Sequence, residues 1–416
     1  MATRADVIIN PENEWRTVSP GSLGWARDPR PDAAKKYFMI STDTHLSPPA
    51  KLFKERIADE FKDRLPRVEV RDGKKYLLIE GAKPSRIMEP DMEGEDLLRT
   101  KSGAAPITQE LAEMEKEKTG LARIADQEMD GVDGEIIFPN GPALLLWSSA
   151  DARFAHAQAQ IWNDWAMEVC GAYFDRCKPV AALVPADLEL TLAEIERVAR
   201  LGYTSVVLPL RPIFGPHQPG NPNYNHPQYD ALWAAIQDHD LTICYHVATG
   251  MDPRTASGAG GAIINYVVHA NAPTMEPIVS MCASGVFERF PKLRAGTVEA
   301  NGGWIGWMLD QMDEAFKKHH FWVQPKLGML PSEYYRRNCY STIAEDSAAM
   351  ILCEPYNLGD NLVWANDYPH HEGTWPHSAE AIERTFLNRV DEETRAKILG
   401  LNAARIFGFE VPERYR

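Results

Sequence analysis

From about residue 134 onward, short and nearly all-apolar runs alternate with longer segments of helical periodicity. The apolar runs contain few polar positions, as expected for parallel strands that are covered on both faces. With the run at 37–43, the expected strands cover 37–43, 134–139, 179–185, 204–210, 241–246, 293–299, 338–343 and 361–367. The expected helices cover 152–174, 188–201, 228–239, 262–284, 303–318, 347–356, 376–389 and 392–407. Eight strands alternating with helices predict an α/β fold of the (β/α)8, or TIM, barrel type.

The alternation is preceded by two segments of a different kind. Residues 1–36 are rich in Pro, Gly and Arg and predict an irregular N-terminal arm. Residues 37–416 then form one barrel domain, with an insertion after the first strand at about 46–130. Within the insertion, DGKKYLLIEG predicts a turn and a strand, and 107–130 predicts a helix whose charges face solvent. An open doubly wound sheet is the weaker alternative, because no dinucleotide-binding glycine motif follows the first strand.

Composition narrows the class of partner. The 416-residue chain has a net charge of −15, which argues against a nucleic-acid or anionic-membrane binder but allows a small anionic substrate. Its six cysteines include no CxxC pair and predict buried, reduced thiols in a cytoplasmic protein. We expect neither a signal peptide nor a membrane span, because no apolar run approaches the ~20 residues that a span needs.

Ligand-type side chains occur where three of the expected strands end. Asp43 and His45 are two residues apart at the end of the first strand, so both side chains leave it on the same face. His246 ends the fifth strand and Asp367 ends the eighth. In a barrel, the carboxyl ends of the strands surround the active site. Two imidazoles and two carboxylates there predict a site for Zn, Mn or Fe.

Other polar residues near the same ends are candidates for chemistry. A divalent ion lowers the pKa of bound water to about 7, and Asp367 is the candidate base for its proton. Glu299 is a candidate second acid–base group or further ligand, or a buried ion-pair carboxylate. His370 is a candidate catalytic group and His371 a candidate substrate contact, unless both are loop residues. Arg211 offers a guanidinium fork to a substrate carboxylate, or forms a surface ion pair.

The chain also resembles a known family. It is similar to the amidohydrolase 2 branch of the metal-dependent amidohydrolases, which includes aminocarboxymuconate-semialdehyde decarboxylase and resorcylate-type decarboxylases. The resemblance covers about 37–408 and is carried by STDTHLSPP, NHPQYDALW, GVFERFPKLRAGTVEANGGW, LPSEYYRRN, NDYPHHEGTWP and NAARIFG. It implies a distorted barrel with one divalent ion, ligands at Asp43, His45, His246 and Asp367, and a homodimer.

This chain departs from the branch in two ways, and these departures determine which function we place first. Asp43-x-His45 replaces the frequent His-x-His motif and favours Mn or Fe over Zn. Glu299 stands where the decarboxylases have a histidine, which places hydrolysis of a small cyclic or carbonyl substrate first. Non-oxidative decarboxylation of an aromatic or unsaturated acid is the second hypothesis. A non-haem iron oxygenase holding two ions, with Glu299 as a ligand, and a metal-stabilised binding protein remain as further alternatives.

Overall fold

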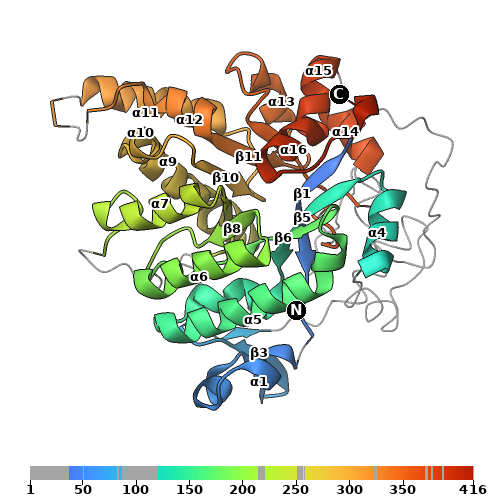
Figure 1. The fold of residues 1–416 in the computed structure, drawn as a ribbon, viewed down its shortest axis with the longest axis vertical. Helices are drawn as coiled ribbons and strands as arrows, with labels where there is room; N and C mark the ends of the chain where they lie inside the picture. The colour runs from blue at the N-terminus through green and yellow to red at the C-terminus, as the bar shows by residue number, and fades with distance from the viewer. Residues whose placement is uncertain are drawn as a thin grey trace.

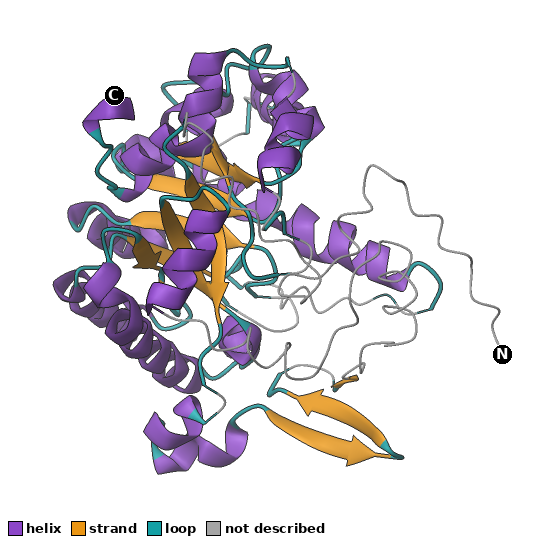
Figure 2. Cartoon of the chain, turned by 90° about the vertical axis from the view of Figure 1, so that its right-hand side faces the viewer, coloured by secondary structure: helices purple, strands orange, loops and turns teal. Residues whose placement is uncertain are grey.

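A ring of parallel strands surrounded by helices forms the centre of the molecule (Figures 1 and 2). The structure is a computed structural model, and it describes residues 37–49, 51–81, 84–86, 120–213, 221–250, 256, 258–319, 321–322, 326–370, 373–375, 378–386 and 388–415. The expected N-terminal arm, 1–36, lies outside the described residues, as do parts of the expected insertion.

The strands follow one another around the ring in chain order. One sheet has the order β1-β5-β6 and a second has β12-β11-β10-β9-β8-β7, and all of these pairs are parallel. Their bounds are Ile40–Leu46 (β1), Gly134–Pro139 (β5), Cys177–Pro179 (β6), Ala181–Ala182 (β7), Ser205–Leu208 (β8), Thr242–His246 (β9), Arg294–Val298 (β10), Cys339–Ile343 (β11) and Leu362–Trp364 (β12).

Two junctions join the sheets into a distorted barrel. Only Val180 separates β6 from β7, and its N–H donates to the carbonyl of Ile137 at 3.0 Å. On the other side, the N–H of His45 donates to the carbonyl of Tyr368 at 2.7 Å, just beyond β12. With β6 and β7 taken as one strand, the described residues supply the eight barrel strands that the sequence predicts.

The apolar pattern of the strands is explained by their burial. Every residue of β1, β5, β8 and β9 is buried, so each strand is covered on both faces. The covering helices are α5 (Ala152–Cys170), α6 (Leu188–Leu201), α7 (Asp230–Asp238), α8 (Gly261–Ile264), α9 (Met275–Ala283), α10 (Val286–Arg289), α11 (Ile305–Lys318), α12 (Pro331–Asn338), α13 (Ser347–Cys353), α14 (Ser378–Phe386), α15 (Glu392–Ala396) and α16 (Asn402–Phe407).

Local signals set where the helices begin and end. The carboxylate of Asp187 accepts from the N–H of Leu190, and Gly202 adopts a left-handed φ of 94°, so α6 has the bounds predicted. The single helix expected over 262–284 is interrupted by a π-helical segment, Asn265–Asn271, and a 3-10 turn that contains Pro273. Proline has no N–H to continue the helical ladder, so a new helix begins at Met275.

The described part of the insertion forms a small unit beside the barrel (Figure 2). It contains α1 (Leu52–Arg56), a 3-10 turn (Asp59–Arg64) and an antiparallel sheet of β2 (Arg67–Arg71), β3 (Lys74–Leu78) and β4 (Ser85–Arg86). Asp72 and Gly73, both at positive φ, form the tight turn between β2 and β3. The turn and strand predicted from DGKKYLLIEG are therefore confirmed.

The end of the insertion departs from the prediction. Within 107–130, residues 107–119, which carry most of the charge run, lie outside the described residues. Helix α4 (Gly120–Met129) is described, as expected, but its polar residues do not all face solvent. Arg123, Asp126, Gln127 and the following Asp130 are all buried. On the described part of this helix, the prediction of solvent-facing charges is wrong for these side chains, because they find hydrogen-bond partners inside the protein.

Two other predictions concern the whole chain. All six cysteines are free and buried, which confirms buried thiols. Among the described helices, none combines the length and apolar character that a bilayer crossing requires.

Candidate metal centre

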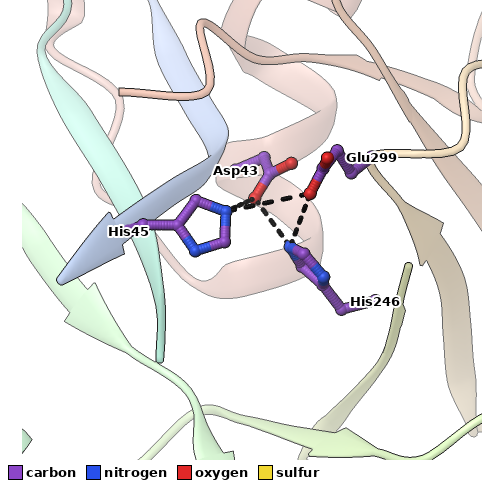
Figure 3. Close-up of side chains that lie close together, drawn as sticks. All are labelled: Asp43, His45, His246 and Glu299. Atoms are coloured by element: carbon purple, nitrogen blue, oxygen red, sulfur yellow. Dashed lines mark hydrogen bonds and ion pairs between the residues drawn. The ribbon is translucent and has the colours of Figure 1, made fainter. Parts of the chain in front are cut away.

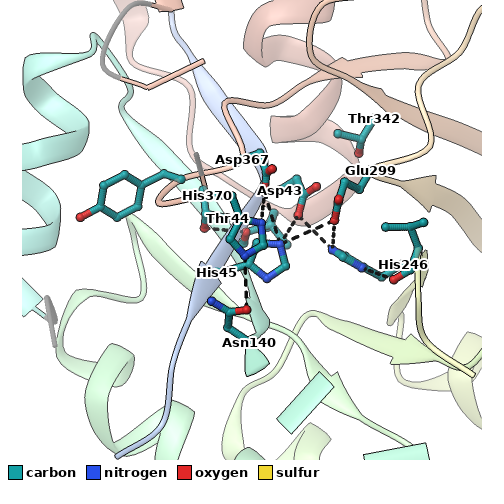
Figure 4. A network of polar contacts seen from close by, with 12 residues as sticks. Asp43, Thr44, His45, Asn140, His246, Glu299, Thr342, Asp367 and His370 are labelled. Atoms are coloured by element: carbon teal, nitrogen blue, oxygen red, sulfur yellow. Dashed lines mark hydrogen bonds and ion pairs between the residues drawn. The ribbon is translucent and has the colours of Figure 1, made fainter. Parts of the chain in front are cut away.

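Five of the predicted site residues meet at the carboxyl ends of the barrel strands. Asp43 and His45 lie near the end of β1, and His246 is the last residue of β9. Glu299 directly follows β10, and Asp367 lies three residues beyond β12. Their polar groups point toward one another from the ends of four strands (Figures 3 and 4).

The nitrogen and oxygen atoms that could bind a metal ion lie close to one another. Nε2 of His246 is 3.3 Å from Oδ1 of Asp43 and 3.4 Å from Oε2 of Glu299. Nε2 of His45 is 3.5 Å from the same Asp43 oxygen, 3.9 Å from Glu299 and 3.4 Å from Oδ1 of Asp367. Each residue thus directs one donor atom toward a common centre.

The second nitrogen of each ligating imidazole is already engaged. Nδ1 of His45 lies 3.2 Å from the carbonyl of Pro139, and Nδ1 of His246 lies 2.7 Å from the carbonyl of Val247. A carbonyl only accepts, so each Nδ1 carries a proton. In the neutral ring, Nε2 then directs its lone pair to the centre, and in His246, whose pKa Asp43 and Glu299 raise, an incoming ion would displace the proton on Nε2. The ring protonated on Nδ1 alone is the tautomer that a metal-binding imidazole needs.

Unsatisfied atoms at the centre test whether a cation fits. Nε2 of His45 and Oδ1 of Asp367 are buried, and the described residues give neither a hydrogen bond of acceptable geometry. Buried polar atoms without partners are costly, and three carboxylates close together repel one another. A divalent cation would pair with the unsatisfied atoms and would neutralise the repulsion between the carboxylates. The donor set therefore fits a metal ion.

Backbone strain places two of the carboxylates. Glu299 and Asp367 have φ angles of 59° and 53°, a left-handed conformation that is uncommon for residues with a side chain. The N–H of Asp367 donates to the carbonyl of Asp43 at 3.1 Å. Beyond Glu299, the N–H groups of Gly302 and Gly303 both donate to Oδ2 of Asp346 at 2.7 Å. Hydrogen bonds to β1 and to the N-cap of α13 therefore hold the two strained turns.

Burial and the facing charges shift the protonation of this group. Burial, followed by the nearby His370, lowers the pKa of His45, which favours the neutral ring. Burial alone would raise the pKa of Asp367, but His370 and His45 outweigh it and hold that pKa below its usual range. Burial and then the charge of Asp367 raise the pKa of Glu299 well above its usual value.

Neighbouring carboxylates raise the pKa values of two histidines. Burial opposes protonation of His246, but Asp43 and then Glu299 overcome it and raise the pKa to about 9. His370 behaves alike: Asp367 overcomes its burial and raises the pKa to about 9.

His370 sits at the edge of the centre. Its Nδ1 is 3.0 Å from Oδ1 of Asp367, its ring stacks on His45 at 4.0 Å between centroids, and Nε2 is 3.3 Å from Oδ1 of Asn140. Asn140 is a site-edge residue that the sequence analysis did not single out. Its position directly after the second predicted barrel strand was the available signal.

The two substrate-contact candidates have different outcomes. Nε of Arg211, beyond β8, donates to Glu276 at 2.9 Å, and Asn223 donates to the other oxygen of that carboxylate at 2.6 Å. Arg211 thus forms the half-exposed ion pair that was the alternative to substrate binding, and its role toward substrate stays a prediction. His371 lies outside the described residues.

Comparisons with known proteins agree with this geometry. A family model described as amidohydrolase matches residues 43–409. Among curated proteins, γ-resorcylate decarboxylase of Polaromonas sp. is 24% identical over 298 residues, covering 68% of this chain and 86% of that protein.

Solved structures show the same fold. An amidohydrolase of Mycobacterium avium subsp. paratuberculosis aligns with a TM-score of 0.71 at 19% identity, covering 91% of this chain and all of that one. A 5-carboxyvanillate decarboxylase of Sphingomonas paucimobilis aligns with a TM-score of 0.60 at 23% identity, covering 90% of this chain and all of that one. A dihydroxybenzoic acid decarboxylase of Polaromonas sp., solved with bound manganese, has a TM-score of 0.59 at 19% identity, covering 91% of this chain and 98% of that one.

These relatives change the order of the predicted functions. An enzyme of the amidohydrolase type, with a His/Asp/Glu cluster suited to a metal ion, is confirmed. The named relatives include several decarboxylases of aromatic acids, so they favour the second hypothesis over the hydrolase that the sequence placed first.

Proposed function

This chain belongs to the amidohydrolase family, and from that premise we propose that it is a metal-dependent, non-oxidative decarboxylase of an aromatic carboxylic acid. Two findings together support the proposal. The chain has a convergent cluster of His, Asp and Glu at the carboxyl ends of its barrel strands, and its curated relative is a γ-resorcylate decarboxylase.

We assign Asp43, His45, His246 and Asp367 as metal ligands, with Glu299 beside them. Their hard oxygen donors and two imidazoles suit Mn²⁺, Fe²⁺ or Zn²⁺, and manganese is bound in the Polaromonas relative. When bound, such an ion supplies a positive charge that holds the anionic oxygens of the substrate and stabilises charge developing in its ring.

One ion per chain is favoured over two. The described residues form two groups of possible ligands, one with Asp43 and His246 and the other with Asp367 and His370. Both groups include His45 and Glu299. Because His45 has only Nε2 free, it can ligate a single ion, so a second ion would have to do without this imidazole. This argues against a two-iron oxygenase.

The protein residues then have to supply a proton. Decarboxylation adds a proton to the ring carbon that bears the carboxylate. The C–C bond then breaks, its electron pair returns to the ring and restores aromaticity, and CO₂ leaves. We assign this proton to the carboxyl of Glu299, whose side chain is 15% exposed against 1% for Asp43 and 8% for Asp367. Greater access to solvent and substrate makes it the best placed donor, and its raised pKa agrees.

The test is direct assay of the full-length protein loaded with Mn²⁺. Incubated with 2,6-dihydroxybenzoate, 5-carboxyvanillate and related hydroxybenzoates, it should release CO₂ and the corresponding phenol. In D₂O, the product should carry one deuterium at the former carboxyl position. Hydrolysis of lactones or cyclic amides, without CO₂ release from any hydroxybenzoate, would restore the hydrolase hypothesis. Oxygen consumed during turnover would instead support an oxygenase.

A further inference from the structure

Helix α4 directs a stripe of polar side chains into the protein. Their spacing of three and four residues places them on one helix face, and each is between 2% and 8% exposed: Arg123, Asp126, Gln127 and Asp130. We propose that this stripe is a positioning device for the metal centre, holding the backbone at His45 and at Asp367. The inference deepens the proposed function and rests on its metal site.

Arg123 ties α4 to the first metal-binding strand. Its Nη1 donates to the carbonyl of His45 at 2.7 Å, while Nε and Nη2 donate to the carboxylate of Glu135 at 2.6 and 2.8 Å. Glu135 lies on β5 and pairs in register with Ser41 of β1. The guanidinium therefore fixes the main chain of a metal ligand against a neighbouring strand.

The same guanidinium reaches the chain beyond Asp367. It lies 4.9 Å from the ring centroid of Tyr368, whose hydroxyl donates to Asp126 at 2.8 Å. The carbonyl of Tyr368 accepts from the N–H of His45 at 2.7 Å. Arg123 and Asp126 thus hold Tyr368, the residue that connects both ligand-bearing segments.

The residue before Asp367 is held by the other half of the stripe. Nδ2 of Asn366 donates to Gln127 and to Asp130, at 3.0 Å each. Both chain neighbours of Asp367 are therefore anchored to α4, while Asp367 itself has the strained φ of 53°. A strained turn keeps its geometry only where surrounding contacts fix it, and α4 provides those contacts.

A purely structural role for Arg123 predicts a different result. A metal site needs donor atoms placed within a few tenths of an ångström, so loss of anchoring should reduce metal affinity and not only stability. Arg197 offers a matched control. It ion-pairs with Glu194, which is 1% exposed, and with Asp164, joining α6 to α5 without contacting a proposed ligand.

The experiment measures the Mn²⁺ dissociation constant of the metal-free, full-length protein by calorimetric titration, together with its unfolding midpoint. Arg123→Lys, which cannot span two acceptors as a fork does, should weaken Mn²⁺ binding by about 10–100-fold. Tyr368→Phe should weaken it less, because the ring remains below the guanidinium. Arg197→Lys should lower the midpoint and leave the dissociation constant unchanged.

The outcomes separate the two roles. Unchanged Mn²⁺ affinity in Arg123→Lys would overturn the inference, whatever happens to the midpoint. If that variant does not fold, Tyr368→Phe decides by the same criterion. A wild-type protein that binds Mn²⁺ but releases no CO₂ would defeat the proposed reaction and leave these affinities decisive. A wild-type protein that binds no Mn²⁺ would defeat both.

Discussion

Two buried clusters of charged residues lie side by side, and they differ in how their polar atoms are satisfied. In the cluster around Arg123, the guanidinium donates three hydrogen bonds and both oxygens of Glu135 accept. In the cluster around His45, nitrogen and carboxylate oxygen atoms approach to 3.3–3.9 Å, most of them from different strands. There Nε2 of His45 and Oδ1 of Asp367 receive no well-formed hydrogen bond from the described residues.

The difference indicates what each cluster does. A buried polar network whose groups are all paired fixes one arrangement of the chain. A buried cluster that gathers several carboxylates and imidazoles, and leaves some of their atoms without a well-formed hydrogen bond, is costly by itself and is suited to hold a cation that completes it. The His45 carbonyl belongs to the first cluster and the His45 ring to the second, so one residue connects the scaffold to the site.

We expect the largest effect when a metal-binding side chain is removed from the cluster around His45. His246→Ala should reduce the metal content from about one ion per chain to nearly none after dialysis, because one of two imidazole donors is lost. Elemental analysis of the purified variant measures this. His239→Ala, at a surface ion pair with Glu196, serves as the control and should keep its metal. Full occupancy in His246→Ala would remove that residue from the site.

The second largest effect is expected when the proposed proton donor, Glu299, is replaced. Glu299→Gln should lower the decarboxylation rate by about 10²–10⁴-fold, because an amide cannot deliver the proton to the ring carbon. Its metal content should stay near that of the wild type, which distinguishes this role from ligation. Steady-state kinetics and elemental analysis of the same preparation test both points. A rate close to wild type would exclude Glu299 as the donor.

A substitution in the cluster around Arg123 should lower the free energy of unfolding. Arg123→Ala should cost about 3–5 kcal/mol of unfolding free energy, because it leaves the Glu135 carboxylate buried without its cation. Replacing both residues by methionine should recover most of that loss. Denaturant unfolding of the metal-free proteins measures it, with Arg56→Ala, at an exposed pair with Glu168, as the control. A loss no larger than the control's would show that the pair is dispensable.

Asp130 provides the smallest effect and a pH signature. Burial raises its pKa from 3.8 to about 7, so the folded protein binds this proton more tightly than the unfolded chain does. The resulting stabilisation is complete below pH ~4 and is lost as pH rises toward 7. The stability of wild type relative to Asp130→Asn should therefore fall by about 2–3 kcal/mol between pH 5 and pH 8. A constant difference across this range would refute the shift.

The sequence by itself determined the barrel and most of the donor set. Nearly all-apolar runs specify strands covered on both faces, and eight of them alternating with helices leave few other folds. Because a barrel brings the carboxyl ends of its strands together, Asp43, His45, His246, Glu299 and Asp367 could be placed at one site from their positions alone.

Only the tertiary structure decided which charges face inward and which atoms stay unpaired. The polar stripe on α4 has helical spacing, but spacing does not show whether solvent or Tyr368 and Asn366 satisfy it. The partner of Arg211 in the structure, Glu276, lies 65 residues away along the chain, so the sequence could not identify it. The physical reason is that burial and pairing depend on contacts between distant segments, whereas strand and helix formation follows from local pattern.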